Sequence, residues 1–222
     1  MRGNYPVDPT ANEVLRQSGF DEYFNEGAGP TPATRGQLVC EDRLDVDSKR
    51  AEARLAKKLI DFATNHQSVP SRLKCVYGHL VDCMTNTHEH ASADAGTERW
   101  WASVFVDKER GCDCFTFIDL GVGIFQSIEL NRRLKIMALF SITRPDIIRK
   151  IFRKEIPSST GLSYRGRGLP SIYESLSLTH SISRLVIATN DVYGDVGPDR
   201  FVVLSKPLKG LLLYWEVNHD QD

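Results

Sequence analysis

The chain has 222 residues, of which 41% are hydrophobic and 26% are charged, as in an ordinary globular domain. Its formal net charge of −1 gives no electrostatic case for nucleic-acid binding, and we expect none. No apolar run approaches the roughly 20 residues of a membrane helix, and the start MRGNYPVDPTANEV lacks the apolar core of a signal peptide. We therefore expect no membrane partner. The five cysteines are scattered, so we expect reduced thiols and a cytoplasmic location.

The first part of the chain is irregular, and we divide the sequence into an N-terminal arm, residues 1–36, and one domain, residues 37–222. Prolines and glycines interrupt the arm and leave one short helical candidate, over 10–24. We expect an ordered arm that docks aromatic side chains on the main body. The alternative is an arm that binds a partner. A short strand is expected over 37–43.

Two amphipathic helices are predicted next, over 47–65 and 71–91. Apolar residues recur in both at the spacing of one helical face, with lysines and arginines on the other side of the first. The expected buried positions are Leu55, Leu59 and Phe62 in the first helix, and Leu73, Val76, Leu80, Met84 and Thr87 in the second.

Strand patterns follow in the middle of the chain. Alternation over 100–106 and 114–118, around the turn sequence DKERG, predicts a β-hairpin that ends at Asp119. The helices expected after it lie over 128–140, 145–154 and 169–178. Pro145 suits the first turn of the second of these helices.

Three strands are expected to finish the chain, over 184–189, 201–205 and 211–217, with a turn-rich connection over 190–200. Helices that precede several strands, with helical crossings between the strands, indicate an α+β two-layer sandwich. We expect one mixed sheet with helices on one of its faces.

A polar flank on the helix over 71–91 is the first candidate functional feature. Asp82, Asn86 and His90 recur at i, i+4 and i+8, so they lie on one side of the helix beside its apolar stripe. The carbonyl oxygen of an Asn side chain suits Mg²⁺, which keeps water and phosphate oxygens as its other ligands. A carboxylate one turn earlier can hold water as a general base. The alternative is a solvated helix edge.

The second feature, Asp119-Leu-Gly121-Val-Gly123-Ile124, directly follows a predicted strand. A carboxylate can accept a hydrogen bond from an adenine amino group, and glycines allow the backbone to approach a ligand without a Cβ. A Rossmann phosphate loop would need a third glycine, and the chain has no GxxxxGK[ST] motif. The alternative is a plain turn after a strand.

The third feature is the segment SSTGLSYRGRGL, which leads into the helix over 169–178. Backbone N–H groups at the start of a helix bind phosphate well. Arg165 or Arg167 can meet a γ-phosphate. The alternative is a flexible, solvated loop.

In this order and with these spacings, the three features resemble the N box, first glycine box and second glycine box of the GHKL ATPase superfamily (gyrase, chaperone, histidine kinase, mismatch repair). The resemblance runs from about residue 70 to the C-terminus and extends loosely to small stand-alone bacterial ATP-binding proteins. It implies a Bergerat-type fold, ATP and Mg²⁺ as cofactors, and Asp82 as the catalytic residue. The ATP-binding residues that it implies are Asn86 (also the Mg²⁺ ligand), His90, Asp119, Gly121, Gly123, Ile124, Ser159, Thr160, Arg165, Gly166, Arg167, Gly168 and Leu169.

Three positions depart from the pattern of the superfamily. Position 82 is usually Glu in relatives, and histidine kinases often carry a basic residue where this chain has Glu89. Many members have Gly-Thr at the start of the closing strand, where this chain has Gly210-Leu211. Thr189, on a neighbouring predicted strand, is a candidate substitute for the missing threonine.

The leading interpretation is a bacterial Mg-ATP-binding protein that uses nucleotide-dependent lid closure as a switch, with slow or partner-stimulated hydrolysis. The alternatives are a protein kinase of the anti-sigma-factor type, which shares Asn-x-x-x-His, and a non-catalytic nucleotide-binding module. Expected partners are ATP or ADP and a protein of unknown identity, and a homodimer is left open. A zinc site is a further alternative, although the spacing is not of the CxxC type. Its candidate ligands are His79, Cys83, His88, His90, Cys112 and Cys114.

Overall fold

The computed structural model describes most of the chain between residues 36 and 219. The described residues are 9, 10, 13, 36–40, 48–65, 70–90, 100–125, 142–156 and 168–219. Nearly all of the helix expected over 10–24, and all of the one expected over 128–140, lie outside them.

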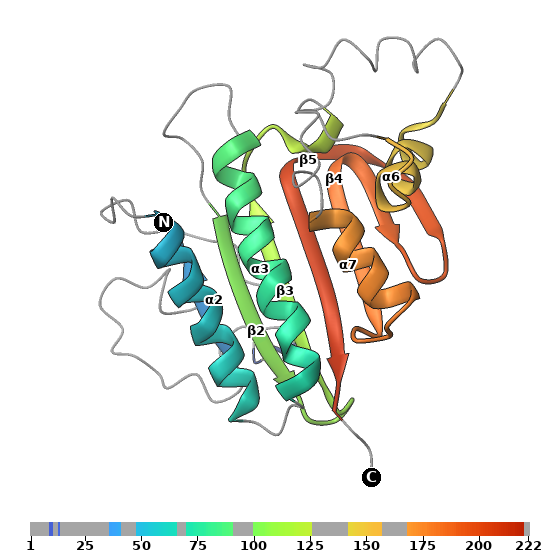
Figure 1. The fold of residues 1–222 in the computed structure, drawn as a ribbon. Coiled ribbons are helices and arrows are strands. Elements are labelled where there is room, and N and C mark those ends of the chain that lie inside the picture. The colour runs from blue at the N-terminus through green and yellow to red at the C-terminus, as the bar shows by residue number, and fades with distance from the viewer. Residues whose placement is uncertain are drawn as a thin grey trace.

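The protein is an α+β structure in which one sheet carries helices on one face (Figure 1). The strands are β1 (Gly36–Cys40), β2 (Trp100–Asp107), β3 (Cys112–Asp119), β4 (Arg184–Asp195) and β5 (Arg200–Asn218), in the spatial order β1-β2-β3-β5-β4. The helices of more than one turn are α2 (Ser48–Thr64), α3 (Pro70–His90), α6 (Arg144–Phe152) and α7 (Gly168–Ser177). Helix α3 packs between α2 and α7, and α6 packs on α7.

The sheet differs from the expected mixed sheet, because every pairing among the described strands is antiparallel. Strands β2 and β3 form one hairpin, and β4 and β5 form another. Strands β3 and β4 run in the same direction, but β5 lies between them and pairs with both. Because β5 separates β3 from β4, these two strands do not form the parallel pair that a mixed sheet would need.

The C-terminal half of the chain has two long strands where three short ones were expected. The predicted strands over 201–205 and 211–217 are both part of β5, and β4 continues through the expected turn-rich connection as far as Asp195. The pairing of β4 with β5 shifts register on either side of Asn190, so β5 has more residues than β4 in this stretch and can carry Pro207 and Gly210. The real turn lies at 196–199.

The other predicted helices and strands are confirmed to within a few residues where the structure describes them. Helix α6 shows the local reasons well: Thr143 and Asp146 form a capping box, and Pro145 lies in the first turn, where its missing N–H costs no hydrogen bond. On α3 the whole expected stripe is buried, from Leu73 to Thr87. No helix of the described residues is long and apolar enough to cross a membrane.

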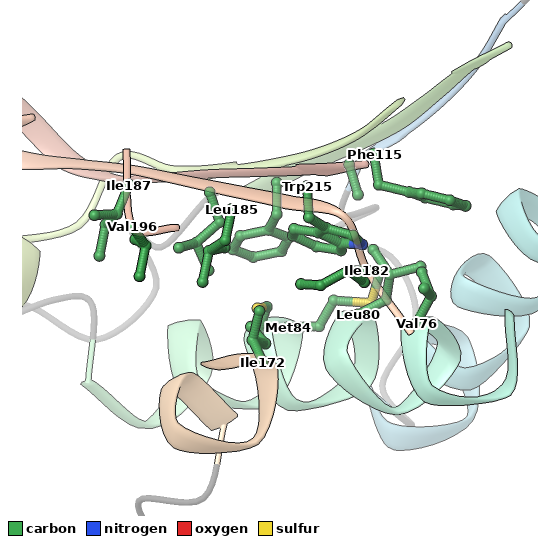
Figure 2. Close-up of a cluster of buried hydrophobic side chains, with 14 of the residues drawn as sticks. Val76, Leu80, Met84, Phe115, Ile172, Ile182, Leu185, Ile187, Val196 and Trp215 are labelled. Carbon is green, nitrogen blue, oxygen red and sulfur yellow. The ribbon is translucent and has the colours of Figure 1, made fainter. Parts of the chain in front are cut away.

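The core fills the space between the sheet and the helices (Figure 2). Phe115 and Trp215 contribute rings whose centroids are 6.1 Å apart, and Met84 and Ile172 face them from α3 and α7. Burying these aromatic and aliphatic side chains is the main source of stability. Alternate residues of a strand share a face, so Asp119 faces the helices as Phe115 does. The core thereby places a carboxylate at the end of β3, on the helix-covered side.

A buried polar contact joins α3 to α7. His79 is 2% exposed, and its Nε2 lies 2.8 Å from Oγ of Ser175, which is also buried. Burial lowers the pKa of His79 from 6.5 to about 4, because the low-polarity surroundings disfavour the imidazolium. The histidine is therefore neutral at pH 7 in the folded protein.

The burial of His79 predicts that the protein loses stability in mild acid. Between pH 6.5 and about pH 4 the unfolded chain binds a proton at His79 that the folded protein does not, so stability rises with pH in that window. At about 1.36 kcal/mol for each pKa unit, the full effect is roughly 3 kcal/mol. Urea unfolding of wild type and His79→Gln at several pH values measures it. The free energy of unfolding of wild type should approach that of His79→Gln as the pH falls to 4. A difference in free energy of unfolding that does not change with pH would contradict this prediction.

Candidate functional site

Asp119 is the central residue of the candidate site. It is the last residue of β3, it is 6% exposed, and Leu211 of β5 lies directly opposite it. Its Oδ1 accepts a hydrogen bond of 2.8 Å from the backbone N–H of Gly121, and the backbone N–H of Leu211 also donates to the carboxylate. Burial nevertheless raises the pKa of Asp119 above its usual range. The structure thus holds a desolvated acceptor at the end of the sheet.

Two glycines lie at close approaches around the candidate site, one beside Asp119 and one beside Asn190. Gly210 has φ +92°, and a Cβ there would lie 2.0 Å from the backbone oxygen of Asp119. Gly123 has φ +76°, and a Cβ there would lie 2.5 Å from Oδ1 of Asn190. Both positions favour glycine for conformation, and Gly210 also requires it for space, because the atoms that a Cβ would meet there are backbone atoms.

Thr189 lies on β4 and shares the sheet face of Asp119, because both are paired with Leu211 of the strand between them. It is fully buried, and its hydroxyl accepts a hydrogen bond of 3.0 Å from the N–H of Ile124. The same hydroxyl donates to the carbonyl of Gly210 at 3.0 Å. Thr189 therefore contacts the backbone of the segment that follows β3.

Asn190 is a residue of the site that the sequence did not reveal. The sequence predicts a turn-rich connection that begins at this residue, but Asn190 lies inside β4 with φ +50°, a conformation that Asn adopts more readily than most residues. Its amide contacts the segment after β3 at two backbone groups, the carbonyl of Val122 and the N–H of Phe125. The only local signal was an Asn at the end of a predicted strand.

The polar flank of α3 meets the start of α7. A Cβ at Gly168, the first residue of α7, would lie 2.8 Å from Nδ2 of Asn86 and 3.4 Å from Cβ of Asp82. Both polar side chains are half-buried, and burial raises the pKa of Asp82. The absence of a side chain at Gly168 is what allows the backbone of α7 to approach them.

Cys83 shows that this flank and the end of β3 belong to one region. The thiol is 5% exposed, and its pKa is raised first by burial and then by the carboxylates of Asp82 and Asp119. Helix α3, which carries Asp82 and Cys83, packs against β3, which ends at Asp119. In the fold, parts of all three sequence features come together around α3, the end of β3 and the start of α7.

The remaining candidate residues have different outcomes. Ile124 is 8% exposed and belongs to the core, and Leu169 packs against the core from α7, so the structure gives both side chains a packing role. The side chain of His90 lies outside the described residues, and so does the part of the segment SSTGLSYRGRGL that precedes Gly168. The candidates of that segment are Ser159, Thr160, Arg165, Gly166 and Arg167.

The candidate zinc ligands do not gather in the part of the chain that the structure describes. His79 and Cys83 lie on α3, whereas Cys112 and Cys114 alternate with Phe115 along β3 and so face away from the helices. Within the described ranges, no group of three or more His, Cys, Asp or Glu side chains is arranged to hold a metal ion.

Comparison of the chain with protein-family models and with curated protein sequences finds no match. The argument for function therefore depends on the sequence features and on the geometry of the site.

Proposed function

We propose that the protein binds Mg-ATP between α3, the end of β3 and the start of α7, and uses this binding as a conformational switch with slow or partner-stimulated hydrolysis. The observation that carries the proposal is the approach of Gly168 to Asn86 and Asp82 on α3, a helix that also packs against β3, the strand that ends at Asp119. These residues come from three distant features whose order resembles that of the GHKL superfamily.

The adenine end of the proposed site is Asp119. An ionised carboxylate has about four acceptor positions, and two backbone N–H groups occupy part of this capacity. The remaining capacity suits the exocyclic amino group of adenine. Because the residue is 6% exposed, water competes weakly for that hydrogen bond.

The phosphate end of the proposed site is the start of α7 beside Asn86. The first N–H groups of the ten-residue helix α7, to which Pro170 contributes none, have no partner within the helix, and the helix dipole favours an anion there. A bound Mg²⁺ would screen the charge of the phosphates. The side-chain oxygen of Asn86 is a suitable hard ligand, but one amide is too few for tight binding of the ion alone. Metal affinity should therefore depend on the nucleotide.

Asp82 is the candidate general base. It lies one helical turn before Asn86, and burial raises its pKa, which makes the carboxylate more basic than an exposed aspartate. Radiolabelled ATP distinguishes the possible activities, because an ATPase releases phosphate, a kinase labels a protein, and a binding module retains unchanged nucleotide.

The proposal predicts that Mg-ATP or Mg-ADP stabilises the protein and that Asp119→Asn weakens this effect. A ligand at about 100 times its Kd adds about 2.7 kcal/mol to the free energy of unfolding. Loss of a hydrogen bond to a charged acceptor should raise the Kd by roughly 10- to 100-fold. Thermal unfolding and calorimetric titration measure the two quantities.

Asp119→Asn should not destabilise the nucleotide-free protein. Its pKa in the folded state is raised, so its contribution to stability is present at low pH and is lost as the pH rises through that pKa. A neutral side chain removes this cost at pH 7. Asp113→Asn is the matched control, because Asp113 is buried on the same face of β3 at the other end of the strand. Absence of any thermal shift with millimolar nucleotide would contradict the proposed function.

A further inference from the structure

Thr189 and Asn190 hold the loop after β3 from the side of β4. Between them they make four hydrogen bonds to backbone groups. The N–H of Ile124 donates to Oγ1 of Thr189 at 3.0 Å, and the same hydroxyl donates to the carbonyl of Gly210 at 3.0 Å. Nδ2 of Asn190 donates to the carbonyl of Val122 at 3.0 Å, and its Oδ1 accepts from the N–H of Phe125 at 3.3 Å.

The geometry of Asn190 is specific to this contact. The carbonyl of Val122 requires a donor and the N–H of Phe125 requires an acceptor, so only one orientation of the amide satisfies both. The residue lies between two register shifts of β4 and has φ +50°. Gly123 passes so close that a Cβ there would lie 2.5 Å from Oδ1 of Asn190. The bulge therefore aims this side chain at the loop, rather than leaving it in an ordinary strand position.

Thr189 connects the loop to Asp119 through Gly210. The hydroxyl of Thr189 has one hydrogen and two acceptors within reach, the carbonyl of Gly210 at 3.0 Å and Oδ1 of Asn190 at 3.3 Å, so this hydrogen is used inside the protein and not donated to a ligand. Gly210 in turn packs against the backbone of Asp119. The contacts of Thr189 thus fix the two chain segments on either side of the Asp119 carboxylate. The Thr189 side chain does not itself donate a hydrogen bond to the adenine.

We propose that Thr189 and Asn190 are positioning residues, which hold the loop 121–125 in its ligand-ready conformation before any ligand binds. The inference rests on the proposed nucleotide site, whose affinity these residues would set without touching the nucleotide. A loop that is already ordered pays less conformational entropy on binding, so removal of the contacts weakens binding mainly through that cost.

Paired substitutions separate the side-chain contacts from other effects. Thr189→Val keeps the shape and removes the hydroxyl, and Thr189→Ser restores it. Asn190→Gly removes the amide but tolerates the positive φ, whereas Asn190→Ala removes the amide and adds backbone strain. Each of Thr189→Val and Asn190→Gly loses two hydrogen bonds, so we expect the Kd for Mg-ADP to rise about tenfold, with wild-type affinity in Thr189→Ser.

Amide hydrogen exchange in the nucleotide-free protein provides a readout that does not depend on binding. The amide of Ile124 should exchange about tenfold faster in Thr189→Val, and that of Phe125 about tenfold faster in Asn190→Gly, while amides in the middle of α2 stay unchanged. If Thr189→Val does not fold, Asn190→Gly decides the question.

The outcomes separate this inference from the proposed function. Faster local exchange together with a raised Kd supports the positioning role. Faster local exchange with an unchanged Kd overturns it, as does unchanged exchange at both amides. Equally faster exchange in α2 shows a general structural role and also overturns it. If wild type binds no Mg-ADP or Mg-ATP, the proposed function fails and the positioning role fails with it, even where the exchange data show that the loop is held.

Discussion

Gly210→Ala is expected to destabilise the protein by at least about 2 kcal/mol. Gly210 has φ +92°, where a residue with a side chain is strained by about 1–3 kcal/mol. The added Cβ would also lie 2.0 Å from the backbone oxygen of Asp119 and 2.9 Å from Cα of Leu120. Because these are backbone atoms, the strand end itself must move. Urea unfolding of the two proteins measures the loss.

The same variant should weaken Mg-ADP binding even where the protein remains folded, since the displaced backbone carries Asp119. Gly78→Ala is the matched control. Gly78 lies in α3, and a Cβ there would meet no atom within 4 Å. Alanine in a helix interior is favoured over glycine by roughly 0.5–1 kcal/mol, so the control should be slightly more stable than wild type. Equal stability of Gly210→Ala and wild type would contradict the close approach of Gly210 to Asp119.

Local patterns predicted the parts of the fold that depend on neighbouring residues. The stripe of α3 follows from the spacing of apolar side chains, and the hairpin that ends at Asp119 follows from alternation and a turn. The position of β5 between β3 and β4 depends on pairing between distant segments, which periodicity does not encode. The predicted gap between the strands over 201–205 and 211–217 is absent, because the register of β4 and β5 shifts near Asn190 and Pro207 and Gly210 stay within β5.

The candidate site also has a part that neighbouring residues predict and a part that depends on contacts between distant segments. Asp119 and its glycines are adjacent in sequence, so their spacing was sufficient to predict a loop at the end of a strand. The approach of Gly168 to Asn86 joins two elements far apart in the chain, and only the resemblance to the GHKL superfamily suggested it. Asn190 forms side-chain hydrogen bonds with a loop that precedes it by 65 residues. No sequence pattern predicts these hydrogen bonds.

The expected effect on turnover is largest at Asp82. If this carboxylate accepts a proton from the attacking water, Asp82→Asn should keep nucleotide affinity and lower ATP hydrolysis by about 10²–10⁴-fold, the usual contribution of a general base. The geometric reason is its position one turn before Asn86, against the start of α7. Burial of the side chain raises its pKa, so the carboxylate is a stronger base than an exposed one. Asp82→Glu should retain or improve hydrolysis, because it restores the reach found in most GHKL proteins.

Three measurements on each variant distinguish a catalytic Asp82 from a structural one: the Kd for Mg-ADP, the rate of phosphate release with candidate partners present, and the free energy of unfolding. A catalytic role predicts a change in phosphate release alone, whereas a structural role predicts changes in stability or affinity. Asp61→Asn removes an exposed carboxylate on α2, which pairs only with Lys57 on the same helix among the described residues, and should change none of the three. Equal phosphate release from wild type and Asp82→Asn would remove Asp82 from the mechanism. If wild type binds the nucleotide but releases no phosphate with any partner, the kinase and the non-catalytic module become the better interpretations, and protein labelling by radioactive ATP then decides between them.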